Sequence, residues 1–133
     1  MLAFVSAYTE DNSFQTNNTL HNVLLGTMQT SLAHTSVEIG GVLGVYDGAI
    51  EASILVSSDE PKYYDDIKSR VLHAGIIYQQ ECVLFIDDDG KATLVFMDKD
   101  TPSVHGMADV KFNRPTCDHT DLGNGMFLVC DFS

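Results

Sequence analysis

The sequence is poor in positive charge, and this shortage narrows the possible functions. Its 133 residues contain 7 Lys and Arg against 19 Asp and Glu, which gives a net charge of −12. A phosphate backbone would be repelled unless the few cations gathered on one face, so we expect no direct nucleic-acid binding. The same imbalance suits a small cationic ligand, or it serves only to keep the protein soluble.

Cysteine is scarce, and long apolar runs are absent. Cys82, Cys117 and Cys130 are odd in number and lack disulfide or metal-ligand spacing, which favours free thiols in a reducing cytoplasm. The apolar start, MLAFVSAY, has no positive flank and no cleavage signature, and no stretch approaches the ~18 apolar residues of a membrane span. We therefore expect a soluble, cytoplasmic protein that contacts no membrane.

Metal-binding patterns are also missing. The acidic run at 87–90 would need acids at Phe85 and Phe96 to form a calcium loop, so it predicts a turn. Cys117 and His119, with His105 nearby, lack a second pair at ligand spacing. We expect no metal site.

The length fits one domain, with a core at about 1–98 and a C-terminal extension at 99–133. Apolar periodicity predicts a strand at 2–8, a helix at 15–33 and a second helix at about 60–79. Alternating residues predict hairpins at 37–56 and 81–98, and after Asp98 only 125–132 is typical of a strand. His21, His34 and His73 fall on or beside the helices and are expected at the surface or at a stripe edge.

This order of elements predicts an α+β fold of the ferredoxin-like type: an antiparallel sheet with two helices on one face, plus appended C-terminal strands. Such a sandwich hosts enzymes, regulators and interaction modules. The fold class alone therefore does not define the function.

The first hairpin carries an unusual polar pair. Asp47-Gly48 favours a two-residue turn, which would pair Gly44 with Glu51 and place Tyr46 diagonal to Glu51, with backbones about 7 to 8 Å apart. Both side chains would then project from the face opposite the helices. An ordinary exposed tyrosine and glutamate near a hairpin end is the simpler interpretation.

Glycine is frequent on the same face. Gly40 and Gly44 give up side-chain packing, which a strand tolerates where another group approaches the backbone. A ligand or a neighbouring subunit would fit, because a sheet face that its own helices leave uncovered must meet water or a partner.

Three stretches together, FVSAY, GVYDGAIEASILV and YQQECVLFIDDDGKATLVF, resemble the small phage-encoded S-adenosylmethionine (SAM) lyases. This family, formerly described as SAM hydrolases, counters host restriction by destroying that cofactor. The similarity covers about the first hundred residues in the same order. It differs in the loop between Tyr46 and Glu51, which is longer in the relatives.

The resemblance implies a site and an assembly. The family's key tyrosine and glutamate fall on Tyr46 and Glu51. Gln80 and Glu81, in QQEC, resemble the family's stretch at the adenosine end of the pocket, although a polar helix terminus facing water explains QQEC equally well. Ser6 and Tyr8 are further candidates for substrate binding. The family is trimeric, with the substrate held between adjacent subunits.

The reaction implied is an intramolecular attack of the substrate's carboxylate on its γ-carbon, which gives 5′-methylthioadenosine and homoserine lactone without a cofactor or an enzymic nucleophile. Three alternatives stay open. The protein could hydrolyse SAM to homoserine with water as the nucleophile. It could be an acidic DNA mimic that blocks restriction enzymes, or a trimeric sensor that binds a small ligand without chemistry.

Overall fold

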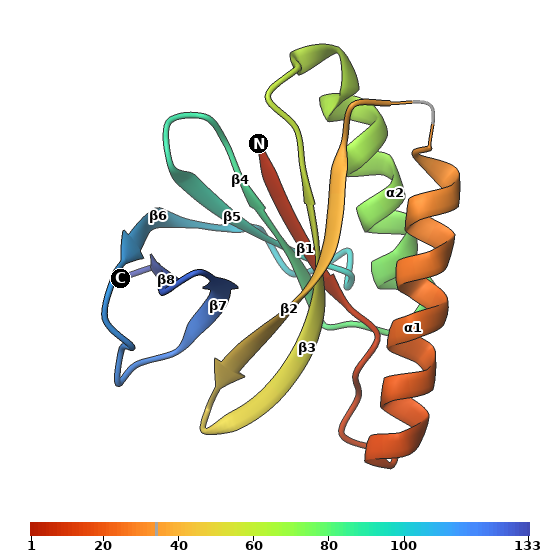
Figure 1. The fold of residues 1–133 in the computed structure, drawn as a ribbon, viewed down its shortest axis with the longest axis horizontal. Helices are drawn as coiled ribbons and strands as arrows, with labels where there is room; N and C mark the ends of the chain where they lie inside the picture. Colours follow the sequence, from red (N-terminus) through yellow and green to blue (C-terminus); the bar gives the residue numbers. More distant parts are fainter. Residues whose placement is uncertain (34) are drawn as a thin grey trace.

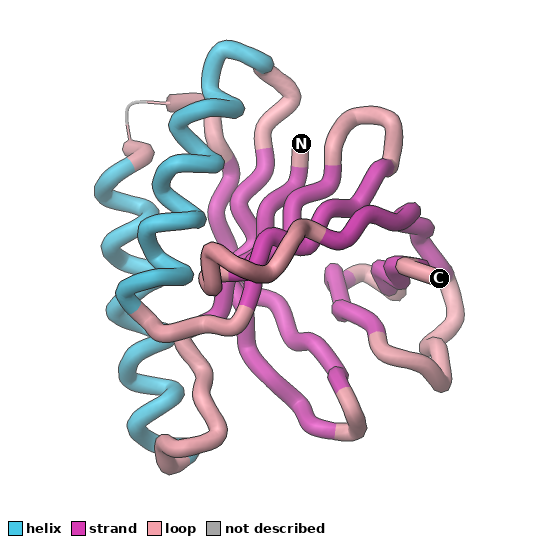
Figure 2. The backbone as a smooth tube through the Cα atoms, turned by 180° about the vertical axis from the view of Figure 1, so that it is seen from behind, coloured by secondary structure: helices cyan, strands magenta, loops and turns pink. Residues whose placement is uncertain are grey.

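Eight antiparallel strands close into a barrel, and two helices lie on its outside (Figures 1 and 2). The structure is a computed structural model that describes residues 1–33 and 35–133, so the expectation for His34 lies outside the described residues. In chain order the elements are β1 (Leu2–Ser6), α1 (Phe14–Ser31), β2 (Glu38–Tyr46), β3 (Ala49–Ser57), the 3₁₀ turn η1 (Pro61–Tyr63), α2 (Tyr64–Ile77), β4 (Cys82–Ile86), β5 (Lys91–Phe96), β6 (Val104–Lys111), β7 (His119–Gly123) and β8 (Met126–Asp131).

The ferredoxin-like prediction, with its open sheet, is wrong. Around the barrel the strands run β1-β3-β2-β7-β8-β6-β5-β4, so the C-terminal strands connect β5 to β2. The sequence pattern predicted β8 but neither β6 nor β7. These strands pair the edge groups that β2 and β5 would otherwise expose, and this pairing favours closure over an open sandwich.

The helices and the early strands form where the sequence predicts them. Helix α1 begins after Ser13, whose hydroxyl accepts a hydrogen bond from the Thr16 amide at 3.1 Å and so caps the N-terminus of the helix. The turn at 87–90 is confirmed by the bond from the Gly90 amide to the Asp87 carbonyl, 3.1 Å. Among the described residues, neither helix is both long and apolar enough to cross a bilayer.

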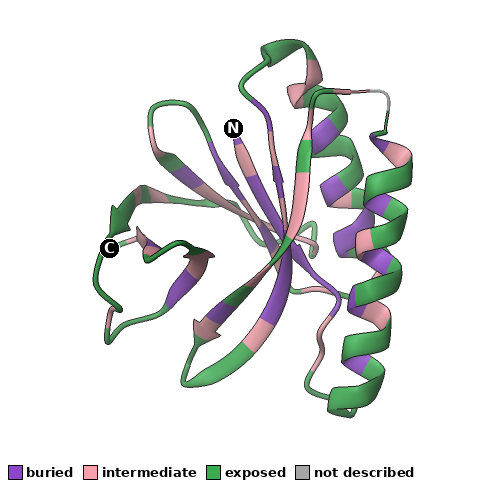
Figure 3. Cartoon of the chain, in the orientation of Figure 1, coloured by how far each residue is buried: buried purple, intermediate pink, exposed green. Residues whose placement is uncertain are grey.

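Two apolar clusters lie on opposite faces of the strands. The outer cluster lies between the helices and the wall formed by β1, β3 and β4, and its largest fully buried side chains are Leu24, Ile54, Ile67, Val56, Val71 and Val83. The inner cluster fills part of the barrel around Phe4, Ile86, Ala92 and Leu128. Figure 3 shows the buried residues concentrated where helices and strands meet. Both faces of β1 and of the middle of β3 are therefore covered by the chain itself.

Of the histidines expected at the protein surface or at a stripe edge, one is exposed and one is buried. His73 is exposed, but His21 is only 8% exposed and lies between α1 and β2. Burial lowers the pKa of the His21 imidazole, so the ring is neutral at neutral pH. The glycine at position 41 makes this possible, because a Cβ there would approach His21 Nε2 to 3.3 Å.

Candidate functional site

The hairpin that joins β2 and β3 has the register that the Asp-Gly pair predicts. Tyr46 pairs with Ala49 and Gly44 with Glu51. The two loop residues, Asp47 and Gly48, have φ angles of 50° and 79°. Such positive values at both positions are typical of the tight turns that match the twist of the strands. The local sequence therefore sets which side chains share a face.

Tyr46 and Glu51 lie on the inner face of the barrel. Along β2 and β3 they alternate in phase with Val42 and Leu55, which belong to the inner apolar cluster. The helices leave this face uncovered, as expected, but the chain's own strands β6, β7 and β8 lie across the barrel from it. The pair therefore projects toward the barrel interior, which the C-terminal strands help to bound.

Three neighbouring strands place Glu51, Gly44 and Thr120 in one row. Gly44 pairs with Glu51 on one side and with Thr120 of β7 on the other. The Tyr46 ring lies over Gly44: a Cβ at that position would overlap the ring and would lie 3.1 Å from the phenolic oxygen. The group that approaches the backbone of Gly44 is thus the tyrosine itself. No such neighbour lies within 4 Å of the Cβ position of Gly40.

The Tyr46 hydroxyl has a defined partner. It lies 2.5 Å from the Thr120 Oγ1, and the Tyr46 side chain keeps partial access to solvent, with 38% of the residue exposed. Burial raises the pKa of the Tyr46 hydroxyl, the bond to Thr120 opposes this rise, and nearby acidic groups, Glu51 among them, add to it. Tyr46 is therefore a neutral hydrogen-bonding group at neutral pH.

Glu51 is a half-buried carboxylate without a cationic partner. None of the ion pairs found among residues 1–33 and 35–133 involves it. Burial raises the pKa of its carboxyl, and the neighbouring Ser6 hydroxyl partly offsets this effect. A carboxylate that is held away from water without a counter-ion favours the approach of a positively charged group from a ligand.

The two candidates from the end of β1 behave differently. Ser6 is buried beside Glu51, where its hydroxyl donates to the Ala52 carbonyl at 2.8 Å and accepts from the Tyr8 amide at 3.0 Å. The Tyr8 side chain instead packs edge-on against Phe14 and His21, on the α1 side of the sheet. The structure brings Ser6 to the Tyr46–Glu51 pair and leaves the Tyr8 ring outside it.

The candidates before β4 do not join the pair directly. The Gln80 side-chain amide donates to the carbonyls of Tyr8, at 3.0 Å, and Tyr78, at 3.1 Å, so it ties the end of α2 to the end of β1. Glu81 is exposed. Burial raises the pKa of the next residue, the Cys82 thiol, and the charges of Glu81 and Glu51 raise it further. Cys82 therefore lies in the electrostatic environment of Glu51 as a neutral thiol.

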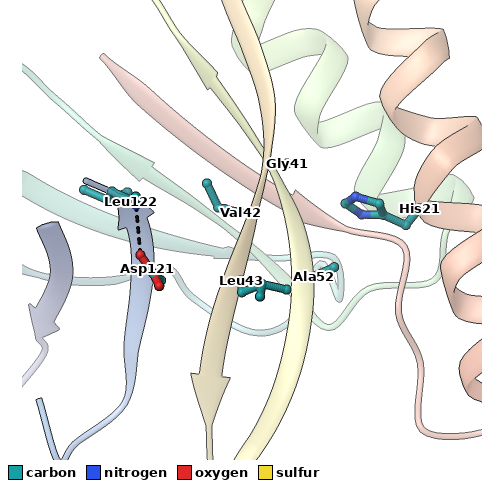
Figure 4. Close-up of a pocket in the computed structure, with 8 residues that line it drawn as sticks. His21, Gly41, Val42, Leu43, Ala52, Asp121 and Leu122 are labelled. Atoms are coloured by element: carbon teal, nitrogen blue, oxygen red, sulfur yellow. Dashed lines mark hydrogen bonds between the residues drawn. The ribbon is translucent and has the colours of Figure 1, made fainter. Parts of the chain in front are cut away.

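A separate hollow of about 360 Å³ lies along β2, where its pairing with β7 ends (Figure 4). In this view the His21 and Asp121 side chains lie on either side of the β2 and β3 ribbons. The Asp121 carboxylate already accepts a bond from the Gly123 amide at 2.9 Å. The polar groups of this hollow do not converge on one point, and Tyr46 and Glu51 do not line it. We therefore place the candidate site at the pair.

Thr120 is the site residue that the sequence pattern misses. It lies in β7, a five-residue strand, HTDLG, with a single large apolar residue. A segment this short and polar resembles a loop. The only local signal is the placement of Thr120 and Leu122 two residues apart, which puts both on the inner face.

A half-buried carboxylate beside a neutral phenol, both on the inner face of a barrel, is an arrangement suited to a small, positively charged ligand. Comparison with protein families identifies the particular group. Residues 3–124 match the S-adenosylmethionine lyase family, and the chain belongs to that family. The match extends beyond the first hundred residues and includes β6 and β7. No curated protein matches the chain.

Proposed function

We propose that this protein is an S-adenosylmethionine lyase that converts SAM to 5′-methylthioadenosine and homoserine lactone. The observation that carries the proposal is the half-buried Glu51 carboxylate, which forms no ion pair with residues 1–33 or 35–133, beside the Tyr46 hydroxyl on the inner face of the barrel. SAM carries a sulfonium and an α-ammonium group, so its charge is complementary to such a site. Membership of the lyase family supports the same substrate.

In the proposed reaction one bond forms and one bond breaks. A carboxylate oxygen of the substrate attacks its own γ-carbon, the bond between that carbon and sulfur breaks, and the electron pair neutralises the sulfonium. No proton is transferred and no group on the enzyme is alkylated. The protein has to hold the methionine chain folded back on itself and to exclude water, and such positioning lowers a barrier by several kcal/mol.

Charge development determines where Glu51 acts. The sulfonium loses its positive charge as the bond breaks, so an anion against sulfur would stabilise the ground state more than the transition state. The α-ammonium keeps its charge throughout. Glu51 therefore binds the α-ammonium, and the Tyr46 hydroxyl holds the same end of the substrate, so that the carboxylate faces the γ-carbon.

The position of a solvent oxygen atom in the product tests the proposal against hydrolysis. We expect SAM incubated with the protein in ¹⁸O water to give 5′-methylthioadenosine and, at the earliest times, unlabelled homoserine lactone in mass spectra. Water attack at the γ-carbon would instead label the homoserine hydroxyl, and later opening of the lactone labels the carboxyl. Homoserine lactone alone in the same buffer is the control. Early hydroxyl-labelled homoserine would refute the lyase reaction, and absence of 5′-methylthioadenosine would refute SAM cleavage.

The assembly and the biological role belong to the same proposal. We expect a homotrimer with the substrate between subunits, and the loss of SAM would deprive a bacterial host of the cofactor that its restriction and modification enzymes use. The open side of the site supports this assembly, since Tyr46 keeps 38% of its surface exposed. Sedimentation equilibrium should give three times the monomer mass of 14.6 kDa. A monomer of full activity would show that one barrel is sufficient.

A further inference from the structure

The hydrogen-bond partner of the Tyr46 hydroxyl lies far from Tyr46 in the sequence. Tyr46 and Thr120 are 74 residues apart, and their hydroxyl oxygens lie 2.5 Å apart. Thr120 is only 2% exposed, so its hydroxyl is shielded from water that could replace Tyr46 as a partner. A buried hydroxyl that lost this partner would be left unsatisfied.

Backbone pairing on both sides fixes the Thr120 hydroxyl in space. Thr120 pairs with Gly44 of β2 and with Leu128 of β8, so its Cα has a hydrogen-bonded strand on each flank. A β-branched side chain has few χ1 rotamers in a strand. The threonine therefore presents its oxygen in one direction.

The Tyr46 ring is restrained at a second point. It lies against Gly44, the residue that pairs with both Glu51 and Thr120. Contact with this glycine limits how far the ring can move toward the strand, and the Thr120 hydroxyl limits rotation of the ring away from it. Together the two contacts keep the phenolic oxygen in the row that contains Glu51.

We propose that Thr120 is a positioning residue that sets the direction of the Tyr46 hydroxyl, so that strand β7 completes the substrate site. This inference rests on the proposed function for its effect on turnover. Its structural part, the link between Thr120 and Tyr46, stands independently of the reaction.

The test compares four single variants and one double variant with the wild type. Thr120→Val keeps the shape and removes the hydroxyl, and Thr120→Ser keeps the hydroxyl. We expect Thr120→Val to lower kcat about tenfold, as loss of one positioning hydrogen bond allows, with a smaller change in KM, and Thr120→Ser to retain most of the activity. The matched control is Thr93→Val, which removes a hydroxyl that bonds His105 across β5 and β6 at 3.1 Å, away from the site. It should leave kcat unchanged.

The fourth variant, Tyr46→Phe, separates positioning from a general structural role. If Thr120 acts through Tyr46, adding Thr120→Val to Tyr46→Phe should cause no further loss of kcat. An equal loss in both backgrounds would overturn the inference. So would wild-type turnover by Thr120→Val, or a folded Thr120→Ser as defective as Thr120→Val.

A readout that needs no turnover distinguishes this inference from the function itself. NMR titration of ¹³C-labelled tyrosine, with the Tyr46 signal assigned from Tyr46→Phe, should show a higher pKa of the Tyr46 hydroxyl in Thr120→Val, because the Thr120 bond lowers that pKa. An unchanged titration would refute the link between the two residues. Failure of the wild type to consume SAM, with the pKa raised as expected, would refute the proposed function and leave this link supported.

Discussion

Glu51→Gln should consume SAM at least about a hundredfold more slowly than the wild type. The amide keeps the size of the side chain but loses the charge that binds the α-ammonium in our proposal. The substrate is then no longer held in position for attack. The rate of 5′-methylthioadenosine formation, followed by chromatography, measures the effect. Glu38→Gln is the matched control: it makes the same change at an exposed residue of the same hairpin and should keep wild-type turnover.

The same variant should be more stable than the wild type at neutral pH. Burial raises the pKa of Glu51 above its unfolded value, so between the unfolded and the folded pKa the native protein binds more protons than the unfolded chain. The free energy of unfolding therefore falls as pH rises through this window and stays lower above it. Glutamine has no charge to bury. We expect the Tm of Glu51→Gln to exceed that of the wild type at pH 7.5, and the difference to shrink below pH 4.5, the ordinary value of the carboxyl.

The turnover rate and the Tm of Glu51→Gln together show whether Glu51 serves substrate binding or the stability of the fold. Lower activity with higher Tm is the pattern of a residue kept for binding at the expense of stability. Wild-type turnover by Glu51→Gln would refute the assignment of the α-ammonium to this carboxylate. A lower Tm at neutral pH would show that Glu51 has a stabilising partner in the free protein.

Gly44→Ala should have the second largest effect, although it changes no functional group. A Cβ at Gly44 would overlap the Tyr46 ring, and the ring has to swing away from the row that contains Glu51 and Thr120. Displacement of a positioning group by about 1 Å can lower a rate about a hundredfold, so we expect a loss between tenfold and a hundredfold. Turnover of SAM and the NMR signal of the Tyr46 ring are the measurements.

The strand supplies its own control for this variant. Gly40 lies four residues earlier on the same face of β2, and nothing lies within 4 Å of its Cβ position. Gly40→Ala should therefore keep the activity and the Tyr46 signal of the wild type. Equal activity of the two variants, both folded, would show that contact with Gly44 does not position the tyrosine.

Local signals explain why the hairpin could be predicted. The Asp47-Gly48 pair favours one turn geometry, and with a side-chain period of two, one turn determines the face of every residue in both strands. The pairing of Gly44 with Glu51 follows from this alone. The helices are equally local, since their apolar stripes and the Ser13 cap lie within single segments.

Barrel closure could not be predicted in the same way, because it depends on pairing between distant segments. In β6 the inward positions include Gly106 and Ala108, residues too small to make a convincing apolar alternation. Gly106 is small for a reason that only the folded chain shows: a Cβ there would overlap the backbone carbonyl of Asp131. The partner of the Tyr46 hydroxyl was missed for the same reason, since Thr120 reaches it only after β7 has joined β2.

The distance in sequence between Tyr46 and Thr120 affects when the protein acquires activity during synthesis. Thr120 lies 74 residues after Tyr46, so a nascent chain from which only β1 to β3 have emerged has the carboxylate and the phenol but not the threonine that we propose orients the phenol. Pairings between such distant segments also form late in folding. If the threonine acts as we propose, the chain would acquire its proposed activity only after β7 has been made and has joined β2.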